Sequence, residues 1–193
     1  MNLLNYLAEN FDLPILDWIA EHLHCGFLDT VMPLITVLGN GGLFWILLAV
    51  VMILIPKYRR AGHAMAFALL MGLVVCNLTL KPLVGRIRPY VYQLEHFGKE
   101  IQLIIATPHD FSFPSGHTIA SFEGATALLI HDRKLGIPAM IVALLIAFSR
   151  LYLYVHYPTD VLASVVLGVG FAFLGSLIAK KVNTLWNQRK VNA

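Results

Sequence analysis

Three short segments hold the side chains that could do chemistry in an otherwise apolar chain. They read KPLVGRIRP at 81–89, FPSGHT at 113–118 and SRLYLYVHYPTD at 149–160. Grouping several cations at a membrane surface costs free energy unless an anion compensates them, so the segments predict an anion-binding site. The residues that could act there are Lys81, Arg86, Arg88, Ser115, Gly116, His117, Arg150, His156 and Asp160.

The residue types favour a phosphoryl group as that anion. Arginine presents a planar fork of donors that suits phosphate oxygens, and lysine adds a compact charge. The PSGH sequence places Ser115 and Gly116 at the start of a helix, where free backbone N–H groups attract anions. Gly116 has no side chain, so an oxygen can approach its backbone closely. The chain contains no P-loop, no GxGxxG and no zinc-ligand spacing, so we predict phosphoryl chemistry without a nucleotide fold.

Two histidines and one carboxylate divide into catalytic roles. Phosphoryl transfer needs a nucleophile and a proton donor for the leaving oxygen, roughly in line. Asp160 lies four residues after His156, and Pro158 suits the first position of a helix. The carboxylate can then reach the ring of His156 and stabilise it as a nucleophile. His117 has no such carboxylate nearby in sequence, which leaves it the role of acid.

The order Lys81–Pro89, Pro114–His117 and Ser149–Asp160 resembles the three-part motif of the type 2 phosphatidic acid phosphatase family, whose fold is shared with vanadium haloperoxidases. The resemblance implies that His156 forms a phosphohistidine, that Asp160 orients it and that His117 protonates the leaving group. It also implies a reaction without a metal ion or other cofactor. Arg86 has no role that the motif defines. The phosphate-binding positions that the motif implies are Lys81, Arg88, Ser115, Gly116 and Arg150.

The composition predicts the elements that must position these residues. Of the 193 residues, 58% are hydrophobic and 13% are charged, whereas soluble domains carry roughly 25% charged residues. A spanning helix needs about 20 mostly apolar residues. We therefore predict an all-α, polytopic membrane helix bundle forming a single domain over 1–193, with the catalytic motifs in 81–160. The expected spans are the apolar runs at 43–56, 62–80, 116–130, 135–155 and 159–179, and GNGG at 39–42 predicts a helix break.

The charges predict the orientation. Under the positive-inside rule, the side with more Lys and Arg is cytoplasmic. The catalytic segments then meet on the extracytoplasmic face of a bacterial-type plasma membrane. Residues 1–29 carry acids and no bases, and we predict an amphipathic helix at the outer interface. If 13–38 crosses separately, the spans number six instead of five. The residues assigned to the cytoplasmic side are Lys57, Arg59, Arg60, Arg133, Lys134, Lys180, Lys181, Arg189 and Lys190.

Other polar residues receive structural interpretations. Cys25 and Cys76 lie far apart in apolar surroundings and predict neither a disulfide nor a thiolate metal site. The EHLHC sequence at 21–25 lacks a second ligand cluster, so no metal site is predicted. Glu123, inside an apolar run, is interpreted as a structural residue that meets Asn77. An interfacial aromatic belt is predicted for Tyr152, Tyr154 and Tyr157.

These observations predict a lipid phosphatase acting on a phosphate monoester or diphosphate. The small size and compact outer segment resemble bacterial family members acting on undecaprenyl pyrophosphate or phosphatidylglycerol phosphate, and phosphatidic acid also fits. The expected partners are the lipid phosphate and the surrounding membrane lipids. The scattered basic clusters do not suit nucleic acid. Two alternatives stay open: a lipid head-group phosphotransferase using the same site, and a lipid-phosphate binding or transport protein without catalysis.

Overall fold

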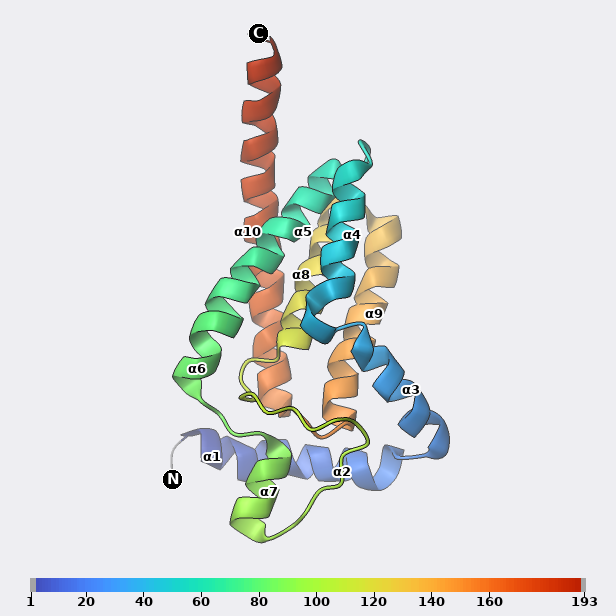
Figure 1. Cartoon of the computed structure of the whole chain (residues 1–193), viewed down its shortest axis with the longest axis vertical. Coiled ribbons are helices and arrows are strands. Elements are labelled where there is room, and N and C mark those ends of the chain that lie inside the picture. The colour runs from blue at the N-terminus through green and yellow to red at the C-terminus, as the bar shows by residue number, and fades with distance from the viewer. Residues whose placement is uncertain (1–2, 192–193) are drawn as a thin grey trace.

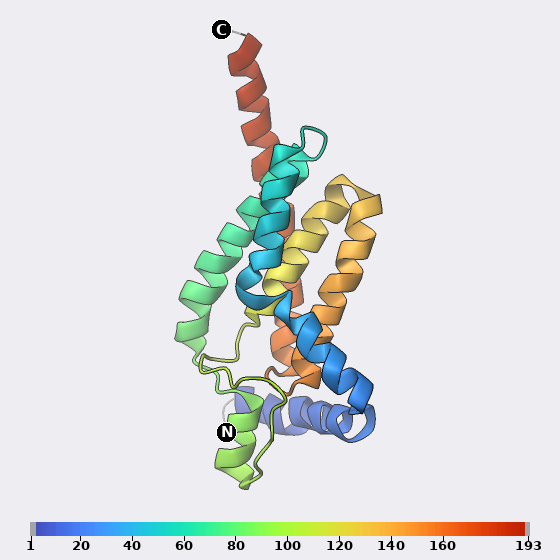
Figure 2. The same ribbon diagram turned by 45° about the vertical axis from the view of Figure 1, so that its right-hand side comes forward.

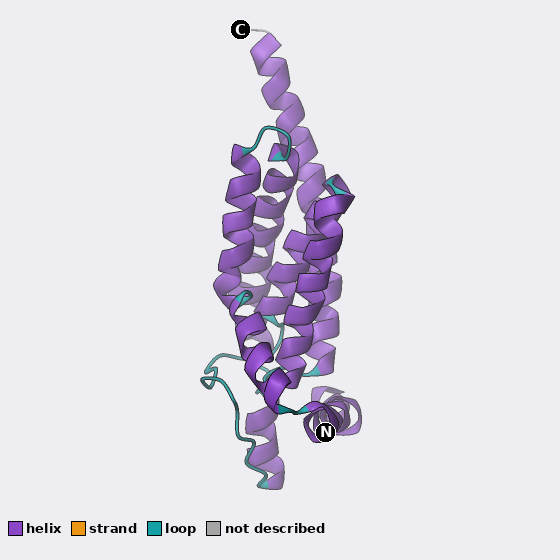
Figure 3. Ribbon diagram, turned by 90° about the vertical axis from the view of Figure 1, so that its right-hand side faces the viewer, coloured by secondary structure: helices purple, strands orange, loops and turns teal. Residues whose placement is uncertain are grey.

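A computed structural model describes residues 3–191, with side chains described for residues 3–184. Every regular element in that range is helical (Figure 3). The helices are α1 (Leu3–Leu7), α2 (Leu13–Leu23), α3 (Gly26–Val37), α4 (Leu43–Leu54), α5 (Arg59–Met71), α6 (Lys81–Val84), α7 (Pro89–Phe97), α8 (Gly116–His131), α9 (Arg133–Tyr152) and α10 (Pro158–Val191). Two π-helical segments, η1 (Ala8–Asp12) and η3 (Gly72–Leu80), and a 3-10 turn, η2 (Asn40–Gly42), link them.

Helices α4, α5, α8, α9 and α10 run alongside one another as a bundle (Figure 1). Small residues let these helices approach closely, as is common in membrane bundles. A Cβ on Gly62 would lie 2.6 Å from the backbone nitrogen of Ile53, and one on Gly175 would lie 2.5 Å from the carbonyl oxygen of Ala64. The buried core contains Trp45, Met65 and other apolar side chains of these helices. The motif-bearing helices are therefore held in a tightly packed scaffold.

The apolar helices are consistent with a membrane protein. Three are long and apolar enough to cross a bilayer within the described residues: Arg59–Phe97, Arg133–Tyr152 and Pro158–Thr184. The pair Gly26–Val37 and Asn40–Leu54 passes the same test together, with a bend of 41°. That bend lies at the break predicted from GNGG (Figure 2). Helix α8 has 16 residues, fewer than the roughly 20 of a full span, so the count of five spans stays a prediction.

The N-terminal arm, defined here as Leu3–Leu23, is helical and lies across the lower end of the bundle (Figures 1 and 3). One face of the arm is buried, and it includes Asp12 and Leu16. The chain then turns at His24 and Cys25, so residues 13–38 do not form one continuous helix. The placement of the arm at a membrane interface stays a prediction.

The connections between helices lie at two opposite ends of the bundle. The α4–α5 and α8–α9 connections lie at the upper end, and the α9–α10 connection and the long segment after α7 lie at the lower end (Figure 1). Local signals explain the helix starts: Asp132 caps α9 through the backbone N–H groups of Lys134 and Leu135, and Pro158 begins α10. The side chains of Arg189 and Lys190, which were assigned to the cytoplasmic side, lie outside the described residues.

Candidate active site

The fold brings the three motif segments together at the lower end of the bundle. A cavity of about 1070 Å³ begins there and continues along the helices. Ser115 and Asp160 are predicted site residues that do not line it and lie behind it, fully buried. The predicted residues that line the cavity are Lys81, Arg88, Gly116, His117, Arg150 and His156.

Asp110 holds two of the predicted phosphate-binding cations. Its carboxylate accepts a hydrogen bond from Lys81 Nζ at 2.6 Å and one from Arg88 Nη2 at 2.5 Å. Burial opposes the charged form, but the hydrogen bond from Lys81 and the charge of Arg88 outweigh it and hold the pKa of Asp110 well below its usual range. Asp110 sits in the irregular segment between α7 and α8, where no periodicity marks it. The only indication in the sequence was that an acidic residue stands between the first two motifs.

Arg150 and His117 face the same part of the cavity. Arg150 Nη1 donates to Thr36 Oγ1 at 2.6 Å and lies 3.5 Å from His117 Nε2. Within the described side chains, the buried Nε of Arg150 has no hydrogen-bond partner. This leaves a donor of a buried cation available for an anion oxygen in the cavity.

The helix break at 39–42 supplies an unpredicted partner of His117. Asn40 Oδ1 lies 2.9 Å from His117 Nε2. Because an amide oxygen only accepts, Nε2 carries the proton in this arrangement. Gly39 is needed here, since a Cβ on it would lie 2.5 Å from the His117 ring. The glycine-rich break therefore lets an asparagine orient the histidine that was predicted as the acid.

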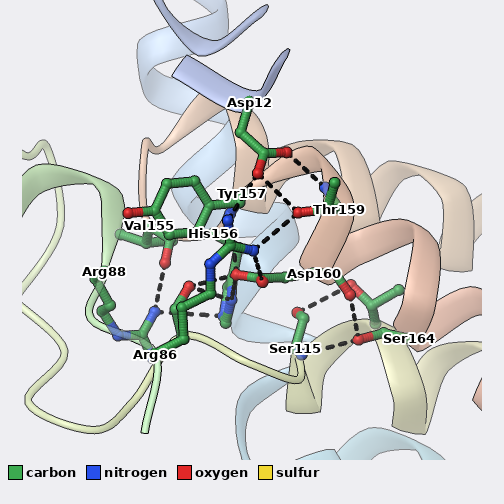
Figure 4. A network of polar contacts seen from close by, with 12 residues as sticks. Asp12, Arg86, Arg88, Ser115, Val155, His156, Tyr157, Thr159, Asp160 and Ser164 are labelled. Carbon is green, nitrogen blue, oxygen red and sulfur yellow. Dashed lines mark hydrogen bonds and ion pairs between the residues drawn. The ribbon is translucent and has the colours of Figure 1, made fainter. Parts of the chain in front are cut away.

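His156 is held with one ring nitrogen toward the cations and the other toward the carboxylate. Arg88 Nη1 donates to Val155 O at 2.6 Å and lies 3.3 Å from His156 Nε2 (Figure 4). A guanidinium group only donates, so Nε2 presents a lone pair and Nδ1 carries the proton. Burial, followed by the charges of Arg88, Arg150 and Lys81, lowers the pKa of His156 well below its ordinary value of 6.5. The ring is therefore neutral and able to act as a nucleophile.

Ser112 links His156 to Asp160. His156 Nδ1 lies 3.5 Å from Ser112 Oγ and 3.7 Å from Asp160 Oδ2. The hydroxyl of Ser112 donates a short hydrogen bond to Asp160 Oδ2, which also accepts from the Tyr157 backbone N–H at 3.1 Å. The carboxylate thus reaches the ring both directly and through a hydroxyl. Sequence reasoning missed Ser112, which stands in the FSFPSGHT segment just before the second motif.

The start of α8 has one residue at the cavity and one behind it. Gly116 lines the cavity, and the Asn77 amide lies so close that a Cβ on Gly116 would be 3.1 Å from its Oδ1. The backbone N–H of Ser115 donates to Ser164 Oγ at 2.8 Å, and the Ser115 hydroxyl accepts from Thr118 Oγ1 at 3.0 Å (Figure 4). Ser164 Oγ in turn donates to the carbonyl of Asp160. Ser115 thus ties the start of α8 to the start of α10.

Arg86 points away from the cavity and pairs with two carboxylates. Its Nη1 donates to Asp160 Oδ1 at 2.5 Å, and its Nη2 donates to Asp12 Oδ2 at 2.7 Å (Figure 4). The guanidinium also stacks on Tyr157, with its central carbon 3.7 Å from the ring centroid. Arg86, which has no role that the motif defines, therefore lies behind Asp160, on the far side from the predicted phosphate-binding cations.

The three tyrosines predicted as an interfacial belt are buried instead, with exposed fractions of 1–4%. The hydroxyl of Tyr152 donates to Asp29, and that of Tyr154 donates to Asp17. Their carboxylate partners come from the N-terminal 29 residues, which the sequence predicted to be an amphipathic helix at the outer interface without partners for its acids. Interaction with these acids, rather than contact with lipid, explains why tyrosine stands there.

The far part of the cavity is apolar and runs between α3, α4, α5 and η3. Glu123 lies along it against Gly72, whose added Cβ would be 2.1 Å from Oε1, and among the described side chains Oε1 has no hydrogen-bond partner. The predicted meeting with Asn77 is replaced by this contact with Gly72. The apolar lining residues include Leu34, Val37, Ile46, Val50, Ile53, Leu69, Leu70 and Leu73. The same cavity thus has a cationic end and continues as an apolar channel.

Comparisons with known proteins show which family the chain resembles. The PAP2 superfamily pattern matches residues 61–184. Undecaprenyl-diphosphatase of Sulfolobus acidocaldarius is 30% identical over 131 residues, covering 67% of this chain and 61% of that protein. Undecaprenyl-diphosphatase BcrC of Bacillus subtilis is 32% identical over 151 residues, covering 78% and 75%. The crystal structure of the transmembrane PAP2 type phosphatidylglycerolphosphate phosphatase from Bacillus subtilis has a TM-score of 0.70 at 26% identity, covering 94% of this chain and 89% of that one.

Proposed function

Because the chain belongs to the PAP2 superfamily, we propose that it is an integral-membrane phosphatase that hydrolyses a phosphate monoester or diphosphate of a lipid. The observation that carries the proposal is one continuous cavity with a cationic end and an apolar end. Lys81, Arg88 and Arg150 suit a phosphate head group, and the apolar channel between the helices suits a hydrocarbon tail. A water-soluble phosphate ester would leave that channel unfilled.

The reaction follows from the two histidines. The lone pair on His156 Nε2 attacks phosphorus, and the bond from phosphorus to the lipid oxygen breaks. The leaving oxygen takes one proton from His117 in its doubly protonated imidazolium form, whose ring Asn40 orients through Nε2, and His117 is left as a neutral imidazole. Water then attacks the phosphohistidine and gives its proton to His117, and inorganic phosphate is released. Lys81, Arg88 and Arg150 stabilise the equatorial oxygens during both steps, together with the backbone at Gly116.

Asp160 stabilises the phosphorylated ring. When Nε2 carries phosphorus and Nδ1 keeps its proton, the imidazole is positively charged. Asp160 Oδ2 faces that Nδ1 at 3.7 Å, and Ser112 lies beside it. We assign Asp160 to orientation and charge compensation of His156, as the sequence predicted. Ser115 acts on the phosphate end through the placement of α8.

The proposed substrates are undecaprenyl diphosphate, phosphatidylglycerophosphate and phosphatidic acid. Relatives named for the first two belong to the same superfamily, and the cavity offers both a cationic head site and an apolar tail path. We place the reaction on the extracytoplasmic side, because the lower end of the bundle lies opposite the α4–α5 and α8–α9 connections, where the sequence clusters Lys and Arg.

Phosphate release from a panel of lipid phosphates and diphosphates tests the proposal. The purified protein in detergent is expected to release phosphate from at least one lipid of the panel without an added acceptor. A water-soluble phosphate ester at the same concentration is the comparison substrate. His156→Gln keeps the size of the side chain and is expected to abolish release. Release that needs an added alcohol would indicate a phosphotransferase, and no release by the wild type would indicate a binding protein.

Vanadate and EDTA provide an independent test of the chemistry. Vanadate adopts the trigonal bipyramid of transferring phosphorus and is expected to inhibit, because the cations and His156 suit that geometry. EDTA is expected to leave the rate unchanged. Loss of activity in EDTA that a divalent ion restores would contradict the metal-free mechanism.

A further inference from the structure

The N-terminal arm brings a carboxylate into the catalytic region from outside the residues that the PAP2 pattern matches, 61–184. Asp12 lies in η1 and its exposed fraction is 0%. A buried aspartate is costly unless every oxygen finds a donor. Figure 4 shows that the carboxylate of Asp12 points toward Arg86 and the first turn of α10.

All of the hydrogen bonds of Asp12 go to the group that holds Asp160. Its Oδ1 accepts from the backbone N–H of Thr159 at 2.8 Å. Its Oδ2 accepts from the Thr159 hydroxyl at 2.7 Å and from Arg86 Nη2 at 2.7 Å. Asp12 therefore caps α10 from another element and fixes one side of the Arg86 guanidinium.

Arg86 transmits that placement to Asp160. Its Nη1 donates to Asp160 Oδ1 at 2.5 Å and to Thr159 Oγ1 at 2.8 Å. Because the guanidinium is planar, fixing Nη2 on Asp12 also fixes the direction of Nη1. With Oδ1 of Asp160 occupied in this way, Oδ2 is the oxygen left to face His156.

The charges of the three groups add to the argument. Asp12, Arg86 and Asp160 are all buried, with exposed fractions of 0–6%. With both carboxylates ionised, the three groups carry a net charge of −1 behind the nucleophile. When His156 becomes phosphorylated and its ring positive, that excess negative charge compensates the charge of the buried ring. Without Asp12 the pair of Arg86 and Asp160 is neutral and loses this advantage.

We propose that Asp12 and Arg86 are positioning residues of the phosphatase, so that the N-terminal arm completes the active site by holding Asp160 in its working orientation toward His156. The inference rests on the proposed function and deepens it. It concerns the formation of the charged intermediate and not the binding of the head group, because neither residue lines the large cavity. The expected signature is a loss in kcat with little change in KM.

The test is a double-mutant cycle of Asp12→Asn and Arg86→Gln in the full-length protein. Each single variant is expected to lower kcat about 10- to 100-fold, as the loss of one charged hydrogen bond would. KM and inhibition by inorganic phosphate should stay within about twofold of the wild type. The double variant should be no slower than Arg86→Gln alone, because Asp12 acts through Arg86. Arg86→Lys should not rescue, since one ammonium group cannot hold both carboxylates in fixed directions.

Glu9→Gln is the matched control. Glu9 lies on the same arm and accepts from Tyr92 Oη at 2.6 Å, so its loss weakens docking of the arm without touching Arg86. It should keep kcat within about twofold. An equal loss in Glu9→Gln and Asp12→Asn would show that the arm acts only by docking and would overturn the inference, as would wild-type kcat in Asp12→Asn.

If Asp12→Asn fails to fold, Arg86→Gln tests the relay by itself, and a kcat of Arg86→Gln within about twofold of the wild type refutes it. If the wild type releases no phosphate from any lipid, the proposed function fails. If the wild type is active and Asp12→Asn has the same kcat, the positioning role of Asp12 is refuted while the proposed function stands.

Discussion

The protonation of His156 is the residue-scale feature on which the chemistry depends. Burial and the charges of Arg88, Arg150 and Lys81 lower its pKa well below 6.5. The folded ring therefore stays neutral as the pH falls from 7.5 through 6.5, where an exposed histidine would gain a proton. Over the same range the unfolded chain binds a proton that the folded state does not, so this residue lowers the free energy of unfolding below pH 6.5.

NMR of histidine rings in detergent measures this protonation directly. The His156 signal, identified by its loss in His156→Gln, is expected to show the neutral ring between pH 7.5 and 6. Saturating inorganic phosphate should move its midpoint upward, because the bound anion offsets the cations. A midpoint at or above 6.5 without phosphate would contradict the cationic surroundings that we describe.

Asn40 provides a second test at the scale of single residues. It accepts from His117 Nε2, and its backbone has no positive φ, so alanine fits there without strain. Asn40→Ala is expected to lower kcat about tenfold with KM little changed, because the acid loses its orientation. Kinetics with a lipid phosphate measure both constants. Asn10→Ala, which removes only a hydrogen bond to the Tyr6 carbonyl, should match the wild type. Equal kcat in Asn40→Ala and the wild type would remove Asn40 from the mechanism.

Close packing of α8 on α9 is the element-scale feature that holds the two helices carrying His117 and Arg150 side by side. Gly136 on α9 lies so near α8 that an added Cβ would be 2.2 Å from Leu129 Cα. The obstacle is backbone, which cannot turn aside as a side chain can. The two helices can therefore meet at this distance only with glycine at 136.

Gly136→Ala is expected to destabilise the protein by about 1–3 kcal/mol through overpacking. Gly170 on α10 has nothing within 4 Å of an added Cβ, so Gly170→Ala should be neutral or stabilise by up to about 1 kcal/mol. Thermal unfolding in detergent compares the two variants with the wild type. An unchanged midpoint for Gly136→Ala would mean that α9 can move away from α8 without cost.

The elements that carry repeating patterns were predictable, and the partners outside those patterns were not. Apolar runs and the Pro158 and GNGG signals located α4, α5, α8, α9, α10 and the bend, because lipid-spanning helices must satisfy their backbone internally and present apolar side chains. The motifs identified six residues that line the cavity, whereas Ser115 and Asp160 lie behind it. Asp110 and Ser112 sit in an irregular segment, where only tertiary contacts reveal their partners. Asp12 was one of several acidic residues used to predict the side of the membrane on which the N-terminal segment lies. Nothing in the sequence around Asp12 indicates that it pairs with Arg86, 74 residues away.

At the scale of the whole molecule, the two ends of the bundle differ in charge and in chemistry. Lys57 in the α4–α5 connection, Arg59 and Arg60 at the start of α5 and Arg133 at the start of α9 lie at the end of the bundle opposite the catalytic end. At the catalytic end Lys81, Arg86, Arg88 and Lys99 are each paired with a carboxylate. On the side that we propose to be cytoplasmic, the first set is available to anionic lipid, whereas each cation of the second set has a carboxylate partner within the protein.

The native cysteines can report which side the catalytic end faces. Cys25 is exposed and adjoins His24, whose ring stacks on Tyr152, whereas Cys76 is buried. A membrane-impermeant maleimide added to intact cells is therefore expected to label the wild type and not Cys25→Ser. In the Cys25→Ser background, Lys57→Cys should react only after the membrane is permeabilised, because the α4–α5 connection lies at the opposite end. The reverse pattern would place the phosphate-binding cavity in the cytoplasm and would mean that the positive-inside assignment fails for this chain.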